Sequence, residues 1–272
     1  MQGTKTQGHG YAWLAALLVV VLFGALLAGY FVPASEGVDQ NGYICAARRL
    51  ALTGSAAKYI AHPLEYVSDN VVQTGAGLYY PKYPLGYPWL CAFAWRLGGP
   101  DAVFLVNPIL AALALAGVFL LARAMVNAYA GALAAILLVT NPWHAYFGLT
   151  ALSHSGSIAF AVWGMYFLWR WVVGGGRVNA FAAGALTAYA CTIRYSEALL
   201  ALPVLAMIVW RYVELSKWGN GSDRVKNSSD GGAAVPPDPR YPRFSGDSGG
   251  SAAPRTVGSE IFHTFSIMDR KP

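Results

Sequence analysis

The chain has 272 residues, of which 56% are hydrophobic and 12% are charged, and its formal net charge is +6. A soluble domain carries about 25% charged residues, so this composition excludes an ordinary soluble protein and predicts an integral membrane protein. The positive charges are spread along the chain rather than gathered in one stripe, so a nucleic-acid partner is not expected.

Six apolar segments are candidates for membrane-spanning helices, which need about 20 apolar residues. They run from Tyr11 to Val32, Ala102 to Ala122, Ala128 to Tyr146, His154 to Val173, Val178 to Ile193 and Ala198 to Trp210. The first exceeds the roughly 7 to 15 residues of a signal-peptide core, so we expect it to be retained as an anchor after a cytoplasmic N-terminus of residues 1–10. Together the spans define a transmembrane domain over residues 11–216.

Basic residues in the short connections predict the orientation of these spans. Arg123 follows the second span, Arg170 and Arg177 flank the connection after the fourth, and Arg211 and Lys217 follow the sixth. With six spans all five lie on one side, which the positive-inside rule assigns to the cytoplasm. The sequence therefore predicts a multi-pass protein of the plasma membrane, with the long loop of residues 33–101 facing outward.

The outward loop contains two candidate surface helices. Residues 40–52 place their apolar side chains on one helical face, as expected for a helix in the headgroup plane. Residues 57–86 are polar, aromatic and rich in turn formers, which predicts irregular structure. Residues 88–97 are too few to span a bilayer and predict a second surface helix or a re-entrant piece.

The composition changes after Ser216 to a mixture of Gly, Ser, Pro and Asp, which predicts a disordered tail over residues 217–272. The three cysteines, Cys45, Cys91 and Cys191, are scattered and indicate neither a disulfide framework nor a metal site. No metal or other cofactor is expected. The predicted fold is thus an all-α integral membrane protein with about six transmembrane helices, interfacial helices in the first outward loop and a disordered C-terminal tail.

Four short segments stand in a particular order against the spans. They are Asp39-Gln40-Asn41-Gly42-Tyr43 after the first, Lys82-Tyr83-Pro84-Leu85-Gly86-Tyr87-Pro88 before the second, Ser153-His154-Ser155-Gly156 at the start of the fourth, and Arg194-Tyr195-Ser196-Glu197 between the fifth and sixth. In this order they resemble the GT-C superfamily of polyprenyl-phosphate-sugar glycosyltransferases, which includes protein O-mannosyltransferases and lipid A aminoarabinose transferases. The resemblance covers about residues 11–212, and because such enzymes usually have roughly twice as many spans, the chain resembles their amino-terminal half.

The resemblance implies a function and a set of site residues. The expected reaction moves a sugar from a polyprenyl phosphate to an acceptor hydroxyl or amine at the outward face. Asp39 would be the base that takes the acceptor proton, and His154 would assist proton transfer. Lys82, Tyr83 and Arg194 would bind the donor, with Lys82 meeting its phosphate. The chain departs from the family pattern at two positions. Residue 40 is a glutamine where a second acid is frequent, and His154 stands near where some relatives have another carboxylate.

Each of these residues also has a simpler interpretation. Asp39 is well placed to cap a helix, and Lys82 to anchor the loop at the bilayer surface. Arg194 would pair with Glu197 on a helix, and His154 would be hydrogen-bonded inside a helix bundle. For the whole chain, the alternatives are a non-catalytic membrane scaffold and a transporter, although the centres of the second, third and fourth spans contain no ionisable residue.

Overall fold

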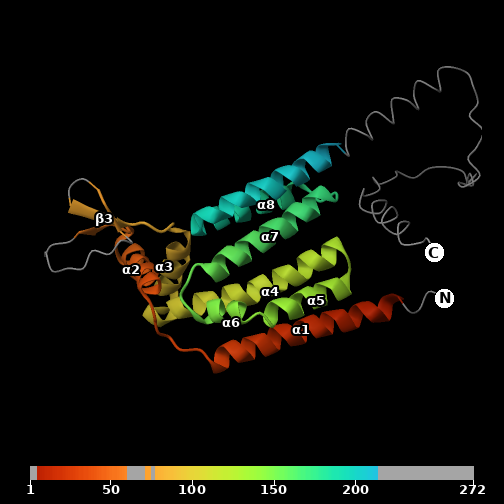
Figure 1. Ribbon diagram of the computed structural model, residues 1–272, viewed down its shortest axis with the longest axis horizontal. Helices are drawn as coiled ribbons and strands as arrows, with labels where there is room; N and C mark the ends of the chain where they lie inside the picture. Colours follow the sequence, from red (N-terminus) through yellow and green to blue (C-terminus); the bar gives the residue numbers. More distant parts are fainter. Residues whose placement is uncertain (1–4, 60–70, 75–76, 214–272) are drawn as a thin grey trace, which may run out of the picture. The chain divides into compact units, whose positions relative to one another are not determined.

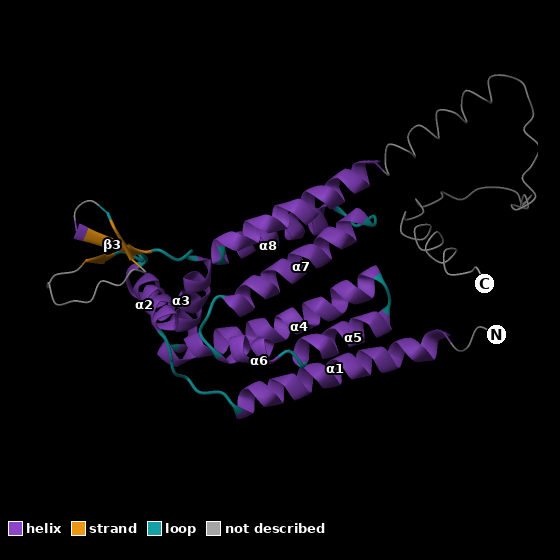
Figure 2. Cartoon of the chain, viewed as in Figure 1, coloured by secondary structure: helices purple, strands orange, loops and turns teal. Residues whose placement is uncertain are grey.

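The computed structural model describes residues 5–59, 71–74 and 77–213, and most of these are helical (Figure 2). The chain divides into two compact units, one formed by Met1–Trp171 with Gly175–Leu202 and the other by Val172–Gly174 with Pro203–Pro272. The predicted disordered tail lies outside the described residues. The first unit holds the packed helices and the candidate site.

The helices, which Figure 1 shows in chain order, coincide with the apolar segments of the sequence. They are α1 (Lys5–Gly29), α2 (Val38–Thr53), α3 (Gly86–Gly98), the 3-10 helix η2 (Pro100–Leu105), α4 (Val106–Met125), α5 (Ala128–Val139), α6 (Pro142–Leu149), α7 (His154–Val172), α8 (Arg177–Ile193) and the 3-10 helix η3 (Tyr195–Leu200). Residues 201–213 continue as helix. The prediction of a mainly helical protein is confirmed, and so are the helices expected over residues 40–52 and 88–97.

Only some of these helices are long and apolar enough to cross a membrane. Among the described residues, Pro100–Met125 and Tyr195–Val213 qualify, and α5 with α6 makes a third if the bent pair is one span. The apolar part of α1, Trp13–Gly29, is shorter, and α8 has 17 residues, several of them polar. The composition of these helices supports membrane association, while the number of spans remains a prediction.

The third predicted span is not one continuous helix. α5 and α6 meet at an angle of 66°, with Thr140 and Asn141 between them. The Asn141 side chain accepts a hydrogen bond of 3.0 Å from the backbone N–H of Trp143, and Pro142 occupies the first turn of α6. An asparagine cap followed by proline starts a new helix in a new direction.

α4 packs against its neighbours where glycines allow close approach. A β carbon at Gly117 would lie 2.9 Å from Val162 Cγ1 on α7, and one at Gly131 on α5 would lie 2.7 Å from the Phe119 carbonyl oxygen. The Trp163 indole N–H donates to the Leu113 carbonyl over 2.9 Å, which further ties α7 to α4. Small residues therefore bring the helix backbones together.

A small sheet occupies part of the segment for which irregular structure was predicted. Its strands are β1 (Lys58–Tyr59), β2 (Val71–Gln73) and β3 (Leu78–Pro81), arranged antiparallel in the order β1-β3-β2. The prediction was wrong here because tyrosine and valine, which favour strands, outweigh the nearby turn residues. Residues 60–70 and 75–76 of this segment lie outside the described residues.

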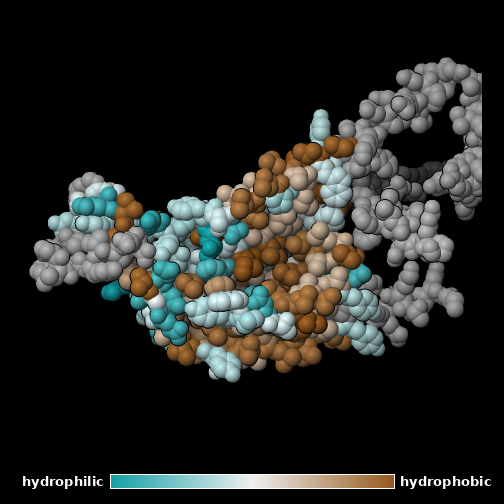
Figure 3. Space-filling view, viewed as in Figure 1, coloured by the Kyte–Doolittle hydropathy of each residue, from teal (hydrophilic) through white to brown (hydrophobic). Residues whose placement is uncertain are grey.

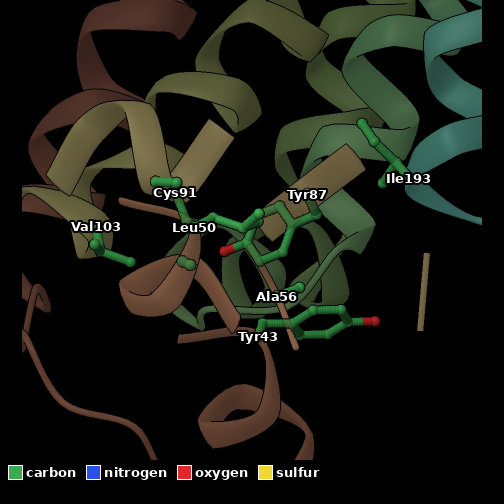
Figure 4. Close-up of a cluster of buried hydrophobic side chains, with 9 residues drawn as sticks. Tyr43, Leu50, Ala56, Tyr87, Cys91, Val103 and Ile193 are labelled. Carbon is green, nitrogen blue, oxygen red and sulfur yellow. The ribbon is translucent and has the colours of Figure 1, made fainter. Parts of the chain in front are cut away.

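A buried cluster joins α2 and α3 to the end of α8. It contains Tyr43, Leu50, Ala56, Tyr87, Cys91, Val103 and Ile193, which Figure 4 labels. Tyr43, Ala47 and Leu50 belong to the apolar face predicted for residues 40–52. The Arg96 side chain on α3 donates to the carbonyls of Ala51 and Leu50 over 2.9 and 3.3 Å, and so satisfies the end of α2. This cluster fixes α2 and α3 on the bundle.

Candidate functional site

The residues selected from the sequence lie at ends of elements that meet at one end of the first unit. Asp39 is in the first turn of α2, and Tyr83 is in the loop between β3 and α3. His154 is the first residue of α7, and Arg194 directly follows α8. Figure 1 shows that α2 and α3 lie beside this end of α8. The fold thus brings together segments that are far apart in the sequence.

Asp39 makes a hydrogen bond to a distant segment and does not cap its helix. Its side chain is exposed, and its Oδ1 accepts a hydrogen bond of 2.7 Å from the Tyr83 hydroxyl. The N-cap residue of α2 is Gly37, without a side-chain cap, while Gln40 Oε1 accepts from the backbone N–H of Glu36 over 3.1 Å. A carboxylate in the first turn of a helix is also favoured by the helix dipole.

Tyr83 and Lys82 share the short loop before α3. Lys82 is exposed, so its ammonium is accessible beside the residue that contacts Asp39. The hydrogen bond to the Asp39 carboxylate is the main cause that raises the pKa of Tyr83 to about 12, followed by burial and by the Asp39 charge. The phenol therefore stays a neutral hydrogen-bond donor at neutral pH.

Tyr43 joins α2 to α7, a contact that the sequence did not predict. Its hydroxyl donates to Ser153 Oγ over 3.1 Å, and its ring centre lies 5.1 Å from that of Tyr83 and 5.2 Å from that of Tyr87. Burial raises the pKa of Tyr43, and the hydrogen bond to Ser153 and the charge of Arg194 oppose that effect. Tyr43 and Ser153 both fall in the quoted segments, which was the available signal that they would meet.

His154 stands beside this link and is half-buried. Its ring stacks on Phe147 at a centroid distance of 4.0 Å and an angle of 3°. Its Nδ1 atom is buried and has no hydrogen-bond partner among the described residues, so the simple interpretation of a fully hydrogen-bonded histidine does not apply to that nitrogen. Arg194 lies close enough to interact with the imidazole electrostatically.

The side chains of Arg194 and Glu197 have different surroundings. Glu197 Oε1 accepts a short hydrogen bond from the hydroxyl of Ser157, a residue on α7 that is only 3% exposed. Arg194 is half-buried, and its charge acts on Tyr43 and His154. The arginine is therefore positioned toward the start of α7.

Five of the side chains described here form one group, which we call the polar cluster: Asp39, Tyr43, Tyr83, Ser153 and Arg194.

Gly86 holds the two sides of the polar cluster together. A β carbon there would lie 2.6 Å from the carbonyl carbon and oxygen of Thr192 near the end of α8. The Tyr189 hydroxyl, also on α8, donates to the Gly86 carbonyl over 3.0 Å. The loop that carries Lys82 and the segment that carries Arg194 therefore leave from opposite sides of one tight backbone contact.

An apolar cavity of about 280 Å³ lies among α4, α7 and α8. Its lining residues are Leu110, Leu113, Ala159, Phe160, Trp163, Phe167 and Leu186. Phe160 links this lining to the start of α3, because its ring packs at 4.6 Å on Tyr189, whose hydroxyl donates to the Gly86 carbonyl. Figure 3 shows the wider pattern, with hydrophobic residues gathered along the helices and hydrophilic ones at the end that carries α2 and the sheet.

Within the described residues, no group of three or more histidine, cysteine, aspartate or glutamate side chains is arranged to hold a metal ion. Comparisons of the chain with protein-family models, with curated proteins and with solved structures find no match.

Proposed function

We propose that this chain is a GT-C-type membrane glycosyltransferase, which moves a sugar from a polyprenyl phosphate to an acceptor hydroxyl or amine at the outward face of the membrane. The observation that carries the proposal is the hydrogen bond between Asp39 and Tyr83, directly beside Lys82. In this proposal a base and a cation from distant parts of the sequence act on one substrate. Sugar transfer from a phosphate carrier requires both.

The proposed reaction assigns one step to each residue. Asp39 takes the proton from the acceptor hydroxyl or amine as its oxygen or nitrogen forms a bond to the anomeric carbon of the sugar. The bond from that carbon to the phosphate oxygen breaks, and the electron pair leaves with the polyprenyl phosphate. Lys82 and Arg194 stabilise the charge on this leaving group. His154 assists the proton transfer to Asp39.

The apolar cavity supports a lipid-linked donor. A polyprenyl phosphate has a charged head and a long apolar chain, so its site needs both kinds of surface close together. The cavity among α4, α7 and α8 is lined by apolar side chains, and Phe160 with Tyr189 connects it to the residues around Gly86. A soluble sugar nucleotide would have no use for such a lining.

The proposal includes a multi-pass arrangement in the plasma membrane with about six spans. Helices occupy all six predicted segments, and the α2–α3 region lies at the end where successive helices would emerge on the outward side. Spans of fewer than 20 residues are accommodated by tilt, bilayer thinning and snorkelling arginines. The cytoplasmic side would then carry Arg123, Arg170 and Arg177.

Donor binding by Lys82 provides the test. The purified protein in lipid nanodiscs is incubated with a radiolabelled polyprenyl-phosphate sugar, and both bound donor and transferred sugar are measured. We expect Lys82→Met to weaken donor binding about 10-fold to 100-fold, because a charge-assisted contact is lost. Lys58→Met, which removes the same charge from β1, should leave binding unchanged. Equal binding by both variants and the parent would contradict the proposed role of Lys82, and absence of binding and transfer altogether would favour a membrane scaffold.

One observation favours a second function, transport. The bend of 66° between α5 and α6 is the kind of broken helix that transporters use. His144 on α6 is an ionisable residue close to this bend and is only 2% exposed. A transporter would move a solute into sealed proteoliposomes without forming a glycosidic product, so measuring both uptake and product in the same vesicles separates the two functions.

A further inference from the structure

Tyr83 contacts a different partner from the one that the sequence suggested. It was expected among the donor-binding residues, but its hydroxyl donates to Asp39 Oδ1 over 2.7 Å. Its ring packs against Tyr43 at a centroid distance of 5.1 Å, and its Cε2 would lie 4.0 Å from a β carbon at Gly42. Tyr43 is itself buried and hydrogen-bonded to Ser153, the residue directly before α7. The phenol is therefore held by the core on one side and holds the carboxylate on the other.

This contact leaves one carboxylate oxygen available. Oδ1 accepts from Tyr83, and no hydrogen bond to Oδ2 is found within the part of the chain that the structure describes. An exposed aspartate without such a contact would sample several rotamers, and a base must be within hydrogen-bond reach of the acceptor proton to act. Fixing Oδ1 thus presents Oδ2 in one orientation.

The protonation state of Tyr83 suits this arrangement. Because its pKa is raised to about 12, chiefly by the hydrogen bond to Asp39, the phenol remains a donor throughout the range in which a carboxylate base works. It therefore does not compete with Asp39 for the acceptor proton.

We propose that Tyr83 is a positioning residue for the base: its hydroxyl orients the Asp39 carboxylate so that Oδ2 receives the acceptor proton, and it does not bind the donor. This inference rests on the proposed function. It also gives the loop before α3 two tasks, since Lys82 would meet the donor phosphate while its neighbour aligns the base.

The kinetic test separates positioning from donor binding. Tyr83→Phe keeps the ring and removes the hydroxyl. We expect kcat to fall about 10-fold to 100-fold with the KM for the donor unchanged within a factor of about 2, because the base is misaligned while the phosphate ligand remains. Tyr80→Phe, on β3 and exposed, is the matched control and should behave as the parent protein. A raised donor KM with unchanged kcat in Tyr83→Phe would overturn the inference in favour of donor binding.

A second measurement does not depend on activity. Tyrosine labelled with ¹³C at Cζ is followed by NMR, and the Tyr83 signal is assigned by its loss in Tyr83→Phe. In the parent protein this signal should keep the chemical shift of a neutral phenol at pH 11, whereas Asp39→Asn should shift it toward that of a phenolate, because the negative partner is gone. If Asp39→Asn leaves the signal unchanged, the positioning contact is refuted whatever the activity. If the signal moves but the parent transfers no sugar, the contact stands and the proposed function fails.

Discussion

The starts of α2 and η3 each hold one carboxylate against a hydroxyl donor, and the two regions differ in access. Asp39 is exposed, and its donor Tyr83 comes from a loop near the surface. Glu197 is half-buried, and its donor Ser157 is 3% exposed inside the bundle. The same pair of groups therefore presents a reachable carboxylate in one region and a largely enclosed one in the other.

This difference indicates separate tasks for the two acids. The base of the proposed reaction has to meet the acceptor, so accessibility favours Asp39 for that role. A half-buried carboxylate that accepts a charge-assisted hydrogen bond mainly ties two elements together, here η3 and α7. Glu197 is therefore better suited to hold the segment that carries Arg194 than to act on substrate.

The largest expected effect separates the two acids directly. Asp39→Asn should lower transfer about 100-fold to 10,000-fold, because an amide cannot take the acceptor proton while its oxygen can still accept from Tyr83. Glu197→Gln is the matched control and should retain transfer within a few fold, since the amide oxygen still accepts from Ser157. Labelled product is measured with each variant at equal protein in nanodiscs. The reverse ranking would exchange the roles of the two carboxylates.

The next-largest effect concerns the tight contact between Gly86 and the Thr192 backbone, which holds the start of α3 against the end of α8. Gly86→Ala should lower the free energy of unfolding by about 3 kcal/mol, because its β carbon would overlap the Thr192 backbone and neither side is flexible. Gly184→Ala, on α8 with nothing within 4 Å of the added carbon, should be neutral or stabilise the helix. Thermal unfolding in detergent compares the two variants. Equal stability would mean that the α3–α8 contact is looser than the structure has it.

The sequence predicted the elements of this site better than their contacts. Apolar length and helical spacing located the helices, and α2 buries Tyr43, Ala47 and Leu50 as expected. The sheet was missed because β1 and β2 are two and three residues long, too short for an alternating pattern to be recognised. The bend at Asn141 was missed because the apolar composition continues on both sides of the cap.

Side-chain partners depend on tertiary structure, which local patterns do not report. The hydrogen bond from Tyr43 to Ser153 spans 110 residues and that from Tyr83 to Asp39 spans 44. The four segments quoted above were selected together by resemblance, which does not indicate which of their side chains are in contact. The pairing of Arg194 with Glu197 was the local expectation, and the hydroxyl of Ser157 is the partner that Glu197 has instead.

The smallest expected effect tests how strongly the enclosed carboxylate is held. Ser157→Ala should lower the free energy of unfolding by about 1 to 3 kcal/mol, because Glu197 loses a charge-assisted bond in a half-buried setting. Ser155→Ala, two residues earlier on α7, removes a hydroxyl that donates 2.8 Å to the neutral Phe147 carbonyl, and it should cost only about 0.5 to 1.5 kcal/mol. Denaturant unfolding of the two variants gives the difference. A Ser155 effect equal to or larger than that of Ser157 would show that the Glu197 contact is weakened by solvent, and the distinction between an accessible and an enclosed acid would then lose its energetic basis.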